Sequence, residues 1–108
     1  MQTLIQVVCS EKKSLREIIA HDDKLEKFNF YIEAKRKPGR SPGWAKIHSI
    51  DPHIRGAINI NWQGRVNILN CRVITKGTGK PANIIGDFIR YLLTRFARKI
   101  ESIIVVPR

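Results

Sequence analysis

Two aspartates, a glutamate and a lysine in the N-terminal part of the chain have the residue types needed for magnesium-dependent hydrolysis of phosphodiesters. Asp22 and Asp23 precede Glu33 and Lys35. In such a site two carboxylates hold the metal and a lysine assists the attacking water. Both aspartates also fit a solvent-exposed turn, however, and a Glu-x-Lys tripeptide is common on half-exposed strands. A metal-dependent nuclease is therefore the third-ranked function for this sequence.

The segment Lys76-Gly-Thr-Gly-Lys80 could bind a phosphate at the start of a helix. A P-loop also needs a glycine separated by four residues from the Gly-Lys pair, and a Ser or Thr directly after that pair. Ile74 and Pro81 occupy these two positions, which argues against an NTPase. Free backbone N–H groups and the two lysines would still suit a nucleic-acid phosphate, with a plain loop as the alternative.

The histidines and cysteines do not form a recognisable metal site. His48, Asp51 and His53 could hold a metal ion only if an irregular, proline-containing turn brought them together, and no cysteine is nearby to complete a zinc site. We therefore expect surface histidines, and neither a metal nor a cofactor. Cys9 and Cys71 fall in apolar, strand-like stretches, which predicts buried reduced thiols.

A loop rich in proline, glycine and basic residues spans residues 35–43. Its stretch Pro38-Gly39-Arg40-Ser41-Pro42 resembles the AT-hook peptide, whose Arg-Gly-Arg-Pro core lies in a narrow minor groove. Here a proline replaces the first arginine of that core, and a serine follows Arg40. We therefore expect phosphate contacts from this loop in place of minor-groove recognition, with a solvated charged loop as the alternative. Trp44 follows directly and could stack on a base or pack in the core.

Basic residues are concentrated in the last two thirds of the chain. Residues 34–108 contain fifteen of the twenty Lys and Arg residues but only three of the nine Asp and Glu residues. This segment therefore carries +12, whereas residues 1–33 carry −1. Because repulsion between like charges opposes compaction, an acidic partner explains the excess better than the fold does. A pI near 10.3 is typical of nucleic-acid-binding domains.

The length and composition indicate one globular domain over residues 1–108. A hydrophobic content of 43% is too high for a disordered basic tail. No apolar run approaches the roughly 20 residues of a membrane helix, and the N-terminus lacks the charged and apolar segments of a signal peptide. We expect a cytoplasmic protein without a membrane partner, and the sequence leaves a homo-oligomer open.

The apolar periodicity predicts an α+β fold, in which an antiparallel sheet of five to six strands carries one long helix on one face. Ser14 and Glu17 fit a capping box at the start of a short N-terminal helix. Alternating apolar and polar residues from 28 to 35 predict a strand. The other expected strands lie at residues 4–8, 44–49, 54–62, 66–75 and 103–106.

The turn between the fourth and fifth of these strands can be predicted from the side-chain alternation. A three-residue loop at 62–64 would pair Ile60 with Val66 and would keep apolar and polar faces separate. This loop would place Trp62 at an exposed tip. The break in alternation at residues 68–69 predicts a bulge, or a strand covered on both faces.

The long helix is expected over about residues 82–99, with Asn83 as the N-cap. Its apolar side chains fall within one arc of about 140° at 100° per residue, which predicts one buried face. The residues of that arc are Ile85, Phe88, Ile89, Leu92, Leu93 and Phe96. The residues of the opposite, solvent side are Asp87, Arg90, Tyr91, Thr94, Arg95 and Arg98.

Together these patterns predict a small basic nucleic-acid-binding module without catalytic activity, whose partner is DNA or RNA. The second-ranked function is a protein-interaction or assembly subunit that binds an acidic protein. The expected phosphate contacts come from Lys35, Arg36, Lys37, Arg40, Lys76, Lys80, Arg90 and Arg98, and the expected base-stacking residues are Trp44 and Trp62.

Overall fold

The strands form one sheet of six members, and every neighbouring pair is antiparallel. A computed structural model of the chain describes residues 2–33, 39, 43–54, 56–75 and 81–107. The strand order is β2-β3-β4-β5-β1-β6. The strands are β1 (Gln2–Cys9), β2 (Phe30–Glu33), β3 (Trp44–Ser49), β4 (Gly56–Gln63), β5 (Ile68–Thr75) and β6 (Ile100–Pro107).

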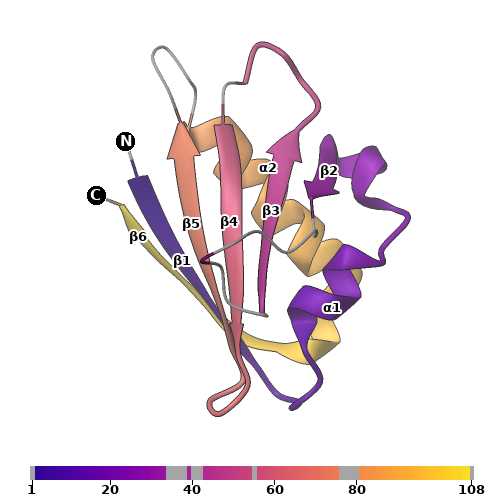
Figure 1. Ribbon diagram of the computed structural model, residues 1–108, viewed down its shortest axis with the longest axis vertical. Coiled ribbons are helices and arrows are strands. Elements are labelled where there is room, and N and C mark those ends of the chain that lie inside the picture. The colour runs from indigo at the N-terminus through magenta and orange to yellow at the C-terminus, as the bar shows by residue number, and fades with distance from the viewer. Residues whose placement is uncertain (1, 34–38, 40–42, 55, 76–80, 108) are drawn as a thin grey trace.

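The helices lie mainly on one side of this sheet. They are α1 (Leu15–Ala20), α2 (Pro81–Phe96) and two 3-10 turns, η1 (Leu25–Phe28) and η2 (Ala97–Lys99). Figure 1 shows α2 crossing behind the sheet, with α1 beside the lower half of β3. The apolar side chains of both helices join those of the strands in one core. The structure is therefore a single α+β domain, as the sequence predicts.

The core is built from alternate residues of the central strands. In β1 the buried side chains include Ile5 and Val7, and their cross-strand neighbours in β5 are Cys71 and Leu69. Directly opposite residues of an antiparallel pair share a face, so these side chains all point towards α2. Cys9 and Cys71 are buried and not linked to each other, which confirms the expectation for the two thiols.

The β4–β5 hairpin has a longer loop than the sequence predicts. Ile60 lies opposite Cys71, not Val66, and the loop covers residues 64–67. This register places the buried side chains of both strands directly opposite each other, whereas the shorter loop would have set Leu69 opposite Ala57 and turned the buried residues of β5 to the face away from Ile60. Asn67 enters the loop at φ 56°, a left-handed conformation that asparagine tolerates.

The expected bulge at residues 68–69 and the exposed position of Trp62 are both wrong. The buried positions of β5 alternate from Leu69 to Thr75 without a register shift, so Ile68 is simply the first residue on the other face. Trp62 belongs to β4, opposite Leu69, and packs against the core. The irregularity that the sheet does contain lies between β1 and β6, at Val8 and Cys9.

The buried face of α2 is rotated relative to the predicted arc. Phe88, Leu92 and Phe96 are buried, as expected. Tyr91, expected in solvent, is completely buried, whereas Leu93 is 51% exposed. Tyr91 can be buried in this orientation of α2 because its hydroxyl donates a hydrogen bond to a side chain of the protein, as described below.

Two smaller boundaries also differ from the sequence prediction, and a third feature agrees with it in part. Helix α2 begins at Pro81, so Asn83 lies inside it and is not the N-cap. The strand expected from residue 28 begins at Phe30, because Asn29 adopts a left-handed conformation (φ 68°) that ends η1. At α1 the Ser14 hydroxyl accepts a hydrogen bond from the Glu17 N–H, which confirms half of the capping box.

Candidate nucleic-acid interface

The second face of the sheet, opposite the core, carries a row of amide side chains. Cross-strand pairing sets Gln6 of β1 beside Asn70 of β5, Asn70 beside Asn61 of β4, and Asn61 beside Trp44 of β3. Gln6 Nε2 donates to Asn70 Oδ1 at 3.4 Å. Asparagines alternate with buried isoleucines along β4. Because successive side chains of a strand point to opposite faces, the isoleucines lie in the core and the asparagines lie on the other face.

A second row, two residues along each strand, carries positive charge. Arg72 of β5 lies beside Asn59 of β4, and Asn59 beside Lys46 of β3. Arg72 is exposed and Lys46 is half-buried. Neither side chain forms an ion pair within the part of the chain that the structure describes. We call the surface formed by both rows the polar face; it comprises Gln6, Trp44, Lys46, Asn59, Asn61, Asn70 and Arg72.

The polar face is hollowed between β3 and β6. The hollow has a volume of about 540 Å³, which lies within the range of about 300–1,000 Å³ of small-molecule sites. Leu4 of β1 and Val106 of β6 border it on one side, and Trp44 of β3 borders it on the other. The polar residues that line the hollow are Gln6, Asn59, Asn61, Asn70 and Arg72.

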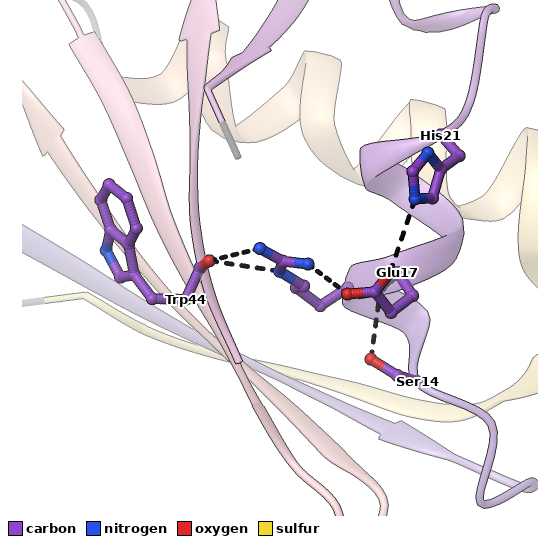
Figure 2. Close-up of polar contacts among 5 residues, drawn as sticks. Ser14, Glu17, His21 and Trp44 are labelled. Carbon is purple, nitrogen blue, oxygen red and sulfur yellow. Dashed lines mark hydrogen bonds and ion pairs between the residues drawn. The ribbon is translucent and has the colours of Figure 1, made fainter. Parts of the chain in front are cut away.

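Trp44 is held at the edge of this hollow through its backbone. The Gly43 carbonyl accepts a hydrogen bond from the Trp62 N–H of β4. Because successive carbonyls of a strand point to opposite sides, the Trp44 carbonyl points towards β2. The pairing of β2 with β3 extends only to Lys46, so β2 does not reach this carbonyl. Arg16 of α1 donates to this carbonyl from Nε at 3.2 Å and from Nη2 at 2.8 Å (Figure 2). Figure 2 shows the Trp44 ring directed away from α1.

Asn59 lines the hollow, but its side-chain oxygen is covered by the protein. Its Oδ1 atom is buried and has no hydrogen-bond partner in the described structure. A buried amide oxygen without a partner costs about 1–3 kcal/mol, so native proteins rarely leave one unsatisfied.

His48 and Glu33 meet on the same face beyond the charged row. His48 Nε2 lies 3.2 Å from Glu33 Oε2, and the imidazole ring stacks on Tyr31 with centroids 4.8 Å apart. His53 and Asp51 are linked instead through a turn, in which the His53 N–H donates to Asp51 Oδ1. Among the described residues no group of three or more His, Cys, Asp or Glu side chains could hold a metal ion.

Asp22, a residue of the nuclease hypothesis, connects the N-terminal segment to α2. Tyr91 Oη donates to Asp22 Oδ2 at 2.8 Å, and Arg95 donates to both carboxylate oxygens at 3.0 and 3.1 Å. Burial alone would raise the pKa of Asp22, but hydrogen bonds from Arg95, the Lys24 N–H and Tyr91 outweigh it and lower the pKa. This carboxylate therefore supports the fold and has no oxygen left over for a metal.

Replacing Asp22 by Asn should lower the free energy of unfolding at pH 7 by about 1–3 kcal/mol, because Tyr91 and Arg95 lose a charged acceptor. Since the pKa of Asp22 is lowered in the folded state, its contribution is present above the pKa of an unfolded aspartate and is lost as the pH falls. Urea denaturation of both proteins should therefore show a difference that shrinks towards acidic pH. The exposed Asp23→Asn is the control; an equal effect there would contradict this account.

The described candidates from the sequence do not gather at one place. Arg90 lies on α2, where its guanidinium sits 5.0 Å from the centre of the Phe28 ring, and Arg98 is exposed on η2. Trp44 borders the hollow but is only 6% exposed, and the half-buried Trp62 packs against the core. The remaining candidates lie outside the described residues; they are Lys35, Arg36, Lys37, Arg40, Lys76 and Lys80.

The amides of the polar face were missed in the sequence, although a signal was present. Asn59 and Asn61 flank Ile60 in a strand whose other face is apolar. Asparagine is depleted in strands, so strand propensity does not explain two asparagines on one face of a strand. Their presence was the signal that this face could have a function.

Comparison of the chain with protein-family models, with curated proteins and with solved structures gives no match. Within the described residues, no helix is long and apolar enough to cross a membrane.

Proposed function

We propose that this chain is a small nucleic-acid-binding module without catalytic activity, and that the polar face is its binding surface. The observation that supports this most is the pair of cations, Arg72 and Lys46, on either side of Asn59 at a hollow lined in part by amides; neither forms an ion pair among the described residues, although Glu33 of β2 lies opposite Lys46. Cationic side chains contact phosphates, and amides have the donors and acceptors that bases need.

Some of the basic residues outside this face have acidic partners. On the helical side, Arg95 is bound to Asp22, Lys99 to Glu11, and Arg90 lies 4.0 Å from Asp87. Arg72 and Lys46, like the exposed Arg98 and Lys27 on the helical side, form no ion pair among the described residues, and Lys46 lies opposite Glu33. The basic run from Lys35 to Arg40 follows β2 and precedes β3 in the chain, so it is tethered to two strands of this sheet.

Binding to a labelled mixed-sequence oligonucleotide should weaken steeply as salt is added, because phosphate contacts release counterions. Four to six contacts predict a slope of log affinity against log salt of roughly −3 to −5, at about 0.7–0.9 per contact. Fluorescence anisotropy of single- and double-stranded DNA and RNA measures this slope. Replacing Arg36 and Arg40 by Glu should make this slope less steep and should weaken the binding of all sequences by a similar factor. No binding to any of the four at low salt would overturn the proposal.

A separate observation favours assembly with a second copy of the chain, the homo-oligomer that the sequence left open. Strand β6 is an edge of the sheet and exposes Ile104, Val105 and Val106 by 40–46%. It has no Lys or Arg from Ile100 to Pro107, although lysine is a common protection of exposed edges. Sedimentation velocity separates these functions, since a homo-oligomer that binds none of the oligonucleotides would support assembly.

The two thiols bear on the location of the protein. Cys9 and Cys71 are buried and unlinked, which fits a reducing compartment such as the cytoplasm. The third-ranked function, a nuclease, gains no support from Asp22, whose carboxylate is bound by Tyr91 and Arg95.

A further inference from the structure

We infer that two copies of this chain associate by pairing their β6 strands antiparallel to each other, with Ile104 of one copy opposite Ile104 of the other. The association uses an edge of the sheet and not the polar face, so it goes beyond the proposed function and needs no nucleic acid. The exposure of β6, the direction of its backbone groups and its sequence carry this inference.

The two edges of the sheet differ in how well they are protected. Strand β2, at one edge, has only four residues and ends at the charged Glu33. Strand β6, at the opposite edge (Figure 1), has eight residues, as many as β1, β4 and β5. Folded proteins commonly shorten or charge an exposed edge strand, because its outer backbone groups otherwise pair with another strand. Strand β6 is therefore the edge that is open to pairing.

The backbone of β6 presents hydrogen-bonding groups to the outside of the sheet. The Cys9 N–H of β1 donates a hydrogen bond towards β5. Because the backbone groups of successive residues point to opposite sides of an antiparallel strand, those of Gln6, three residues earlier, point towards β6. The partner of Gln6 there is Ile104, whose backbone groups therefore face β1. Those of its two neighbours, Ile103 and Val105, face away from the sheet, where a further strand can pair with them.

The exposed segment of β6 matches the same segment of an antiparallel second copy. Pairing centred on Ile104 sets Ile103 of each copy opposite Val105 of the other, so the outward donors and acceptors of both residues are used. Ile104 and Val105, which are 46% and 40% exposed in the single chain, then meet apolar side chains of the other copy. A second copy of the chain therefore satisfies both the backbone and the apolar side chains of this edge.

Antiparallel pairing also keeps the positive charges of the two copies apart. Glu101 is the one charged residue of β6, whereas the preceding turn η2 contains Arg98 and Lys99. The pairing places the two η2 turns at opposite ends of the joined strands. Lys99 lies five residues before Ile104. The two lysines are therefore about 30 Å apart, at about 3.4 Å per residue, and salt screens their repulsion over this distance.

This pairing joins the polar faces of the two copies. The two-fold axis that relates adjacent antiparallel strands is perpendicular to the sheet, and directly opposite residues share a face. The polar face of one copy therefore continues into that of the other. The dimer carries two copies of the row that contains Arg72 and Lys46, both on one face of a single sheet, and a long nucleic acid bound there can contact both.

Single cysteines test the register of the pairing under mild oxidation. In the dimer the Cα atoms of the two Ile104 residues are about 4.5 Å apart, within reach of a disulfide. Those of the two Val105 residues are about 8 Å apart, which is too far. We expect Ile104→Cys to form a disulfide-linked dimer and the matched Val105→Cys to form little of it. The natural Cys9 and Cys71 are buried, so the unmodified chain is the blank. Equal linkage of both variants, or of neither, would overturn the inference.

Sedimentation velocity of the unmodified chain measures the association itself. We expect a monomer–dimer equilibrium that Ile104→Lys weakens by about tenfold or more, because two like charges then lie directly opposite each other. Val66→Lys, at a 53% exposed position between β4 and β5, is the control and should leave the dimer intact. Thermal unfolding shows whether both variants are folded.

A monomer at every concentration up to those used for nuclear magnetic resonance, or equal weakening by the two lysine variants, would refute the pairing through β6. Oligonucleotide binding by such a monomer would leave the proposed function standing. A dimer that binds no oligonucleotide would have the opposite meaning, since the pairing would hold and the proposed function would fail.

Discussion

Phe88→Ala should lower the free energy of unfolding by about 3–5 kcal/mol. Phe88 is completely buried on α2, and its ring meets Phe30 of β2 edge to face with centroids 6.2 Å apart. Truncation would remove one of the ring contacts between the long helix and β2, beside that of Tyr91 with Phe30, and would leave a cavity there. Urea denaturation followed by circular dichroism measures the loss.

Leu93→Ala provides the matched control on the same helix. Leu93 is 51% exposed, so its truncation should cost less than about 1 kcal/mol. The sequence pattern alone placed both side chains in one buried arc. Equal losses for the two variants would contradict the orientation of α2 described above.

Reversing both cations of the charged row should have the largest effect on binding. Arg72→Glu with Lys46→Glu should lower the affinity for a mixed-sequence oligonucleotide by about 10- to 100-fold at low salt, because two phosphate contacts are lost and two repulsions are added. The salt slope should flatten by about 1.4–1.8. Anisotropy titrations at several salt concentrations give both quantities.

The control for this double variant makes the same change of charge elsewhere. Lys13→Glu with Lys27→Glu alters two exposed lysines outside the polar face, on the β1–α1 connection and on η1. It should weaken binding much less than the charged-row variant. If the two double variants lost affinity equally, the effect would be one of net charge, and the polar face would have no special part in binding.

Much of the fold follows from local patterns in the sequence. The strand from Trp44 to Ser49 and the burial of Phe88 and Leu92 were predicted because apolar spacing directly reflects which face meets the core. The β4–β5 register was not predicted, because it depends on which residues of β4 lie opposite Leu69 to Val73. This pairing is a contact between the two strands, and the sequence of either strand alone does not specify it. Turn geometry alone allowed both registers.

Tyr91 and the polar face show why the rest could not be predicted. Tyr91 was expected in solvent because its partner, Asp22, lies in a different part of the sequence. The row from Gln6 through Asn70 and Asn61 to Trp44 draws on four strands whose order is not sequential. The charge of the sequence is the basis for the proposed class of partner, whereas the place where such a partner would bind depends on topology.

The central claim, that the polar face binds nucleic acid, is tested most directly by nuclear magnetic resonance of the side-chain amides. During titration with a single-stranded oligonucleotide, the side-chain NH₂ signals of Asn59, Asn61 and Asn70 should shift. Those of Asn83, exposed on α2, should not. Shifts at Asn83 with unchanged signals from the three polar-face asparagines would place binding on the helical side and contradict the account.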